Sequence, residues 1–351
     1  MCCATGTLDI VAAPKFTPAG NMDLDQIVEK LMPVSRKGGV PFTLPPAVLE
    51  VQPGFVAGAR FERKRKGHRG LRRVSLAKFD PLAVEPSIGR ANVAGADAVR
   101  GALRRVTQVI GLGDGRFALL VPDAAVRVSL LAFETIPSKA QEFEALLCWR
   151  IKDNLPFSTD EARLSYQENW RDEREVEILV LAAKADVMAE YEAELGAVEA
   201  SSVLVLPSTA ALLPLIPEDG GEAQLLIHIC ADWVTSVVVC GKRLRFWRTR
   251  RFNRETPDRI CGEIVPEAAR AFASMRDRFG MEIATVWLSS RPQASDELAS
   301  ELRSALGRSM RTLPGLEAYG TALPAGEQEA FMNYGAPVAG LLLNAGAAPA
   351  A

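Results

Sequence analysis

Few residues of this 351-residue sequence have the types and spacing that catalysis or metal binding requires. The only histidines are His68 and His228, and no two of the six cysteines form a C-x-x-C pair, so the sequence predicts no metal site. The patterns G-x-S-x-G and H-E-x-x-H are both absent, which leaves a hydrolase or a metalloprotease without support. His228 lies in an apolar run, and we expect a buried histidine with satisfied hydrogen bonds rather than a catalytic base.

One glycine-rich segment, Gly111–Arg116 (GLGDGR), has the composition of a phosphate-binding loop. A phosphate loop follows a strand and opens a helix, because the N–H groups at a helix N-terminus bind the anion. Here the order is reversed, since a helical pattern precedes the glycines and a short apolar strand pattern follows them. The segment is therefore predicted to be a connecting turn.

Charge and hydropathy limit the classes of partner. The 41 Lys and Arg against 43 Asp and Glu give a net charge of −2, which does not favour nucleic acid. Two basic segments, 60–73 and 242–254, could face anionic lipid headgroups or nucleic acid, but charged hairpin edges that resist mispairing are the favoured interpretation. Polar residues interrupt the longest apolar runs, so we expect a cytoplasmic protein without a transmembrane segment.

Hydrophobic periodicity divides most of the chain into two similar halves. The order of three strands, helix, strand and helix occurs at about 46–121 and again at 223–306. An internal repeat is a stronger indicator of fold than a short motif. A twofold βββαβα repeat is typical of the duplicated, ribonuclease H-like and actin-like α/β fold. In that fold two domains flank a cleft that normally holds a nucleotide.

A different module interrupts the first half. Its succession of strand, helix, two strands and helix predicts a small inserted α+β subdomain. The N-terminal segment has little periodicity and many Gly, Pro and Thr residues, which predicts a flexible tail. The predicted organisation is a flexible tail over 1–43, the first half of domain 1 over 44–122, the inserted subdomain over 123–198, a return to domain 1 over 199–220, domain 2 over 221–345 and a flexible tail over 346–351.

The inserted module carries the most specific pattern in the sequence. A predicted helix containing Trp149 ends at Pro156 and Phe157, because proline cannot continue a helix. An acidic stretch then leads into a strand that contains Tyr166. A Val-rich strand follows and ends in Ala-Ala-Lys at 182–184.

Together with the return strand and short helix at 204–212, this succession resembles the PilM family of type IV pilus assembly proteins. That family is related to the cell-division protein FtsA and to the cytoplasmic domain of GspL. The resemblance extends over about 46–343, and the segment YGAPVAGLLL resembles the family's last helix. It implies the actin-like fold, as the repeat does.

The resemblance also implies an ATP site, in which each half contributes a D-x-G-[ST] hairpin that holds metal and phosphate. In the first hairpin, Glu50 stands near the position of the Asp, and Gly54 matches the glycine of the pattern. Pro53 lacks the N–H group that a phosphate cradle uses, and Phe55 stands where a hydroxyl is wanted. The first hairpin is therefore degenerate.

The other two nucleotide loops depart from the pattern as well. The second hairpin keeps Asp232 and Thr235, but Trp233 occupies the crowded turn. In the adenosine loop, Ser289 and Ser290 replace the usual glycine pair. We therefore expect a pseudo-ATPase with no cofactor, no metal and no catalytic residue, ATP and Mg²⁺ being disfavoured. The alternative is an active actin-like ATPase or sugar-kinase relative with an unorthodox site.

For function, the resemblance implies a cytoplasmic structural component of a type IV pilus or type II secretion-like platform, peripheral to the inner face of a bacterial inner membrane. The implied partner is a PilN-like single-span membrane protein, whose cytoplasmic N-terminal peptide could bind by strand addition near the inserted subdomain. Trp149, Leu155, Pro156 and Phe157 are the candidate residues for this groove. The alternative for these four residues is that they only end the helix and pack the subdomain. A further alternative is the cytoplasmic domain of a GspL-like protein.

Overall fold

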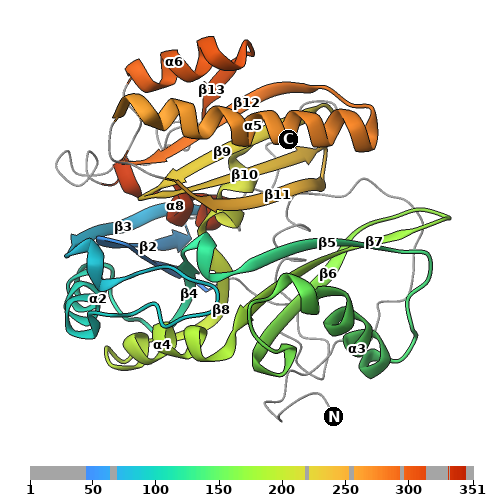
Figure 1. The fold of residues 1–351 in the computed structure, drawn as a ribbon. Helices are drawn as coiled ribbons and strands as arrows, with labels where there is room; N and C mark the ends of the chain where they lie inside the picture. The colour runs from blue at the N-terminus through green and yellow to red at the C-terminus, as the bar shows by residue number, and fades with distance from the viewer. Residues whose placement is uncertain are drawn as a thin grey trace.

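The computed structural model describes residues 45–63, 69–217, 221–252, 257–292, 296–313, 331 and 333–344. The predicted tails over 1–43 and 346–351, together with His68, lie outside the described residues. The described part of the chain forms two five-stranded sheets and one three-stranded sheet (Figure 1).

The first sheet is built around an apolar strand. β1 (Ala47–Gln52) is buried along its whole length, and it pairs antiparallel with β2 (Phe55–Arg63) and parallel with β4 (Arg116–Val121). Pro53 and Gly54 form the β1–β2 turn, in which Gly54 has a φ of +86° that favours glycine. The strand order is β3-β2-β1-β4-β8, with β3 at Arg69–Lys78 and β8 at Ser201–Pro207.

Helix α2 (Ala96–Ile110) covers one face of this sheet. Its apolar stripe of Val99, Leu103, Val106 and Ile110 recurs every three to four residues and is fully buried. A Cβ atom at Gly58 in β2 would lie 2.5 Å from Cγ1 of Val106, so the glycine lets the helix approach the sheet closely. The Gly111–Arg116 segment leads from α2 to β4 as a turn, which confirms the prediction and excludes a phosphate loop there.

The second half repeats this topology and confirms the predicted duplication. Its elements are β9 (Ala223–Cys230), β10 (Trp233–Cys240), β11 (Arg243–Arg251), α5 (Pro257–Phe279), β12 (Ile283–Arg291), α6 (Asp296–Leu306) and β13 (Met310–Thr312). The order β11-β10-β9-β12-β13 matches that of the first sheet, with β9 in the central place of β1. Helices α5 and α6 cover the outer face of this sheet (Figure 1).

The inserted module forms a separate small sheet. β5 (Arg127–Phe133), β6 (Ala162–Arg171) and β7 (Val176–Lys184) pair antiparallel in the order β5-β7-β6, and α3 (Ala140–Ile151) packs on one face. The last helix of the module, α4 (Ala185–Gly196), packs against α2 and joins the apolar core of the first half. The domain boundaries derived from the sequence stay a prediction.

One apolar cluster joins the two halves. The short helix η5 (Ser208–Leu215) and helix α8 (Ala336–Asn344) contribute side chains to a core shared by strands of both five-stranded sheets. Figure 1 places α8 at the junction of the halves. A Cβ atom at Gly340 would lie 2.2 Å from the carbonyl oxygen of Ala211, so this close approach of α8 requires glycine. The two halves are therefore packed against each other through their apolar side chains.

Candidate functional site

The turn of the first hairpin is covered by the segment that follows β3. The carbonyl oxygen of Gly54 accepts a hydrogen bond of 2.9 Å from the N–H group of Phe79. A Cβ atom at Gly54 would lie 3.3 Å from Cγ of Pro81, so the proline side chain lies directly against the turn. Glycine is thus required here for backbone geometry and close packing. The structure gives it no evident role in phosphate binding.

The turn of the second hairpin is engaged with the neighbouring strand. Ala231 adopts a φ of +51°, a conformation that L-residues with a Cβ atom rarely adopt. The Asp232 carboxylate forms an ion pair with Arg251. The backbone carbonyl oxygen of Asp232 accepts a hydrogen bond of 2.8 Å from the N–H group of Phe252. The carboxylate at the position that holds metal in the family's pattern is thus bound to a guanidinium.

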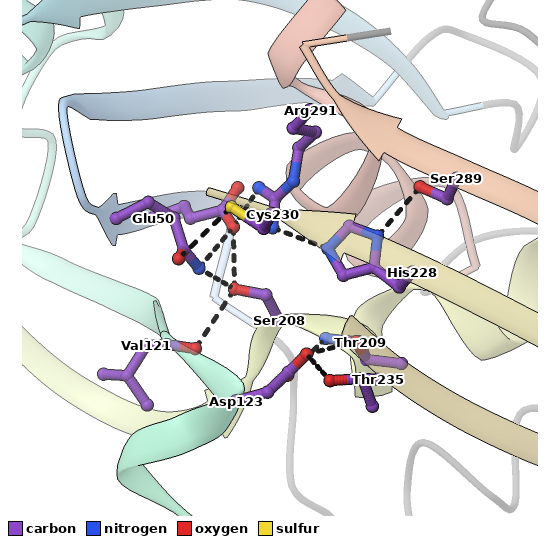
Figure 2. A network of polar contacts seen from close by, with 11 residues as sticks. Glu50, Val121, Asp123, Ser208, Thr209, His228, Cys230, Thr235, Ser289 and Arg291 are labelled. Carbon is purple, nitrogen blue, oxygen red and sulfur yellow. Dashed lines mark hydrogen bonds and ion pairs between the residues drawn. The ribbon is translucent and has the colours of Figure 1, made fainter. Parts of the chain in front are cut away.

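A buried ion pair crosses the cleft between the two halves. Glu50 of β1 and Arg291 at the end of β12 bond each other, although their side chains are only 0% and 1% exposed (Figure 2). Glu50 Oε1 also accepts from Oγ of Ser208 at 2.7 Å and from Nε2 of Gln52 at 3.1 Å. The carboxylate near the Asp position of the family's first hairpin is therefore paired with a cation of the protein itself.

His228 of β9 connects this ion pair to the adenosine loop. Its Nε2 lies 2.9 Å from Nη2 of Arg291, and its Nδ1 lies 3.0 Å from Oγ of Ser289. A guanidinium can only donate, so Nε2 accepts, and the neutral ring carries its proton on Nδ1 and donates it to Ser289. Burial holds the pKa of His228 well below its usual 6.5, and the charge of Arg291 lowers it further. The prediction of a buried histidine with satisfied hydrogen bonds is confirmed.

The neutral state of His228 makes folding stability depend on pH. Because its pKa is lower in the folded state, the unfolded state binds more protons below about pH 6.5. Stability therefore falls as pH drops below 6.5, by at most about 1.4 kcal/mol per unit from this group. We expect the His228→Gln variant, which can accept from Arg291 and donate to Ser289 without titrating, to lose less stability between pH 7.5 and pH 5.0. Denaturant unfolding at both pH values measures the difference, and equal losses in the two proteins would contradict this account.

A second buried carboxylate contacts both halves. Asp123 follows β4 and accepts bonds from the N–H of Thr209 at 2.9 Å, from the hydroxyl of Thr209, and from Oγ1 of Thr235 in β10 at 2.8 Å (Figure 2). Burial raises the pKa of Asp123, while these hydrogen bonds oppose the rise. This contact is a second polar link between the first half and the second.

Together these residues form what we call the cleft network. Its members are Glu50, Gln52, Asp123, Ser208, Thr209, His228, Thr235, Ser289 and Arg291. Ser290 lies outside it and donates to the carbonyl oxygen of Pro292. The donors and acceptors bond mainly to one another, and among the described residues no group of three or more His, Cys, Asp or Glu side chains could hold a metal ion. These residues do not fit a Mg²⁺–nucleotide complex, because a guanidinium stands beside the carboxylate that would bind the metal.

A cavity of about 560 Å³ adjoins the cleft network, and Arg291 belongs to both. Its walls are the β1–β2 turn, the stretch between β3 and α2, the β9–β10 turn and the end of β12, together with Arg251 and Tyr334. We call this cavity the cleft mouth. It contains Gly54 and Asp232 of the predicted site, whereas Glu50, Thr235 and Ser289 belong to the network beneath.

The four predicted partner-binding residues do not form one surface. Trp149 on α3 is 62% exposed, whereas Leu155 and Phe157 pack into the core between α3 and its sheet. Pro156 is exposed, but its ring also packs against Gly89 of the first half, where a Cβ atom would lie only 3.1 Å from Cγ of the proline. Trp149 is therefore the one of the four with its ring mostly free to meet a partner.

Sequence reasoning missed several members of the cleft network. It selected Glu50, Thr235 and Ser289 but not Arg291, Asp123 or Ser208. The available signal was a charged residue at or just after the end of a largely apolar strand pattern, as Arg291 and Asp123 both are. Their contacts could not be inferred, because the Arg291–Glu50 pair joins residues 241 positions apart.

Comparison with known proteins identifies the fold. No protein-family model and no curated protein sequence matches this chain. A chain of the PilM-PilN type IV pilus biogenesis complex superimposes with a TM-score of 0.70 and 16% identity, covering 85% of this chain and 98% of that one. The cytoplasmic domain of EpsL, an inner membrane component of the type II secretion system of Vibrio cholerae, gives a TM-score of 0.46 at 11% identity over 78% and 93% of the two chains. The ethanolamine utilization protein EutJ from Carboxydothermus hydrogenoformans gives 0.44 at 9% identity over 91% and 100%. The chain therefore shares the fold of that pilus-complex chain, which confirms the actin-like α/β fold that its repeat and its resemblance predicted.

Proposed function

We propose that this protein is a structural component of a type IV pilus or type II secretion-like assembly platform and does not hydrolyse ATP. The observation that carries the proposal is the buried Glu50–Arg291 pair inside a fold shared with a chain of the PilM-PilN complex. In an actin-like ATPase the cleft must receive a metal–nucleotide complex. Here a cation and an anion of the protein occupy the corresponding polar region and pair their charges, which supports a scaffold rather than an enzyme.

The proposed location is the cytoplasmic side of a bacterial inner membrane. Among the described residues, no helix has the length and apolar character needed to cross a bilayer. A platform component of this kind would therefore reach the membrane through a partner that spans it. We propose a PilN-like protein as that partner, bound through its cytoplasmic N-terminal peptide.

Trp149 is the residue we propose for the contact with this peptide. Tryptophan buries a large area at low entropic cost, and exposed tryptophans are enriched among the residues that dominate binding energy. Lys152 lies beside the ring, 5.7 Å from its centroid, and is available to pair with an acidic group of the peptide. Leu155 and Phe157 would support the surface from within the subdomain core.

Co-purification with membrane proteins encoded beside its gene tests the proposal. We expect one neighbour with a single transmembrane helix to bind, and its synthetic N-terminal peptide to bind at least about tenfold more weakly to the Trp149→Ala variant. The matched control is Val109→Ala, which truncates an exposed apolar residue on α2. If no such neighbour binds, the platform role is contradicted. If a neighbour binds equally well to both variants, the role stands and the assignment of Trp149 is wrong.

A further inference from the structure

We propose that the cleft mouth is a second docking site, which binds an acidic and apolar segment of a protein partner. In this site Lys78 and Arg90 would bind a carboxylate, and apolar side chains of the segment would cover Leu82. The proposal does not depend on the PilN-like partner, because it concerns a different surface and a different set of residues.

The cavity has the size and lining of a binding site for side chains. Its volume of about 560 Å³ falls within the range of roughly 300–1,000 Å³ that is common for ligand pockets. Phe55 and Tyr334 form an edge-to-face pair with ring centroids 4.8 Å apart, and Trp233 and Pro292 also line the cavity. Aromatic and proline side chains lose little entropy on binding, so such a lining suits apolar groups.

Leu82 presents an apolar side chain at this cavity on a rigid turn. It is 70% exposed, and its N–H group donates to Oδ1 of Asp80 at 3.0 Å. Pro81, which precedes it, packs against Gly54. Single exposed leucines are common, but this one adjoins a cavity and is held in place before any partner arrives. Covering it would remove apolar surface from water without ordering a flexible segment.

The charges of the cleft mouth favour a ligand with a small negative charge. Arg251 is paired with Asp232, and Arg291 is paired with Glu50. Of the remaining charged residues that line the cavity, Lys78 and Arg90 are basic and Glu85 is acidic. Among the described residues, neither Lys78 nor Arg90 forms an ion pair, while the Lys78 ammonium lies 5.0 Å from the centroid of Tyr334. One or two carboxylates would complement this balance.

The same features disfavour a nucleotide. A triphosphate brings several negative charges and needs a cradle of backbone N–H groups. Here Gly54 directs its carbonyl oxygen to Phe79, and the carboxylates of Glu85 and Asp232 line the cavity. A peptide with one or two carboxylates brings fewer negative charges and needs no cradle of backbone N–H groups.

Selection of random dodecapeptides on the full-length protein tests this inference. We expect enriched peptides to carry a net negative charge together with aromatic or aliphatic residues. Their affinity, measured by fluorescence anisotropy, should fall at least about tenfold for Leu82→Asp and for Arg90→Glu. The matched controls are Val109→Asp and Arg104→Glu, which place the same changes on exposed positions of α2.

The outcomes of this experiment distinguish an acidic peptide from other occupants of the cavity. Acidic peptides that depend on Leu82 and Arg90 but not on the controls support the docking site. Enrichment of basic peptides, binding unaffected by Leu82→Asp, or no enrichment would overturn it. Displacement of the probe by micromolar ATP would likewise overturn it, because the cavity would then be a nucleotide site. Thermal melts of all four variants should match that of the unchanged protein, since each change lies on an exposed side chain.

Discussion

The Arg291→Ala variant is expected to unfold with a free energy about 3–5 kcal/mol lower than that of the unchanged protein. Removing the guanidinium leaves Glu50 buried without a counter-charge, and it also removes the donor to Nε2 of His228. The loss is large because both side chains of the pair are withdrawn from water, at 0% and 1% exposure for Glu50 and Arg291. Proteins of ordinary stability have only about 5–15 kcal/mol in total, so equilibrium unfolding in urea resolves the change easily.

A double-mutant cycle shows whether the loss comes from the pair. Arg291→Met combined with Glu50→Leu should cost much less than the sum of the single changes, because no uncompensated charge remains buried. The control is Lys139→Ala, which removes one partner of the exposed pair with Glu142 and should change stability little. The proposed role of the pair is wrong if Arg291→Ala lowers the free energy of unfolding no more than this control does. It is also wrong if the stability losses of the two single variants of the cycle add up to the loss of the double variant.

The Arg243→Ala variant is expected to release the inserted subdomain from the second half, at a cost of about 2–5 kcal/mol. Arg243 of β11 bonds both carboxylate oxygens of Glu177 in β7, at 3.1 and 3.2 Å, and lies over the ring of Trp170 at 3.7 Å. Beside it, Asn169 donates to the carbonyl oxygen of Leu244 and accepts from its N–H group. These contacts are buried, so truncation leaves Glu177 desolvated with one partner fewer.

Hydrogen exchange distinguishes release of the subdomain from general destabilisation. Amides of β6 and β7 should exchange faster in the Arg243→Ala variant, while those of β9 and β12 keep their protection. The matched control is Arg163→Ala, which removes an equally bidentate pair with Glu192 that is partly exposed and should cost less than about 1 kcal/mol. Uniformly faster exchange, or equal effects of the two variants, would contradict a specific contact at Arg243.

Much of the architecture could be predicted from the sequence, because the pattern of apolar residues determines which face of each element is buried. The buried stripe of α2, the paired hairpins and the turn at Gly111–Arg116 all follow from local spacing. The repeat extended this local information to the whole fold, since two similar halves must bury similar faces. The packing of α4 on α2 could not be predicted from the sequence, because the pattern of an amphipathic helix does not specify the surface against which the helix packs.

The site was predictable only in part. The sequence assigned Glu50, Thr235 and Ser289 to a degenerate nucleotide cleft, and in the structure all three are members of the cleft network, while their relation to a nucleotide stays a prediction. It could not indicate that Arg291 pairs with Glu50, because contacts between distant positions depend on the assembled fold. The sequence also could not show that Trp149 is exposed while Phe157 packs into the subdomain core, because residues close in sequence at a helix end can point to opposite sides. Whether the four residues hold a peptide stays a prediction.

Titration with a fluorescent ATP analogue in the presence of Mg²⁺ tests the central claim, that the cleft is closed by the protein's own charges. The account predicts no binding up to millimolar concentrations, and no change in hydrogen exchange of β1, β9 or β12 when the nucleotide is added. Binding at micromolar concentrations that is lost in the Asp232→Ala variant would contradict it, because the second hairpin would then hold a nucleotide despite the Glu50–Arg291 pair.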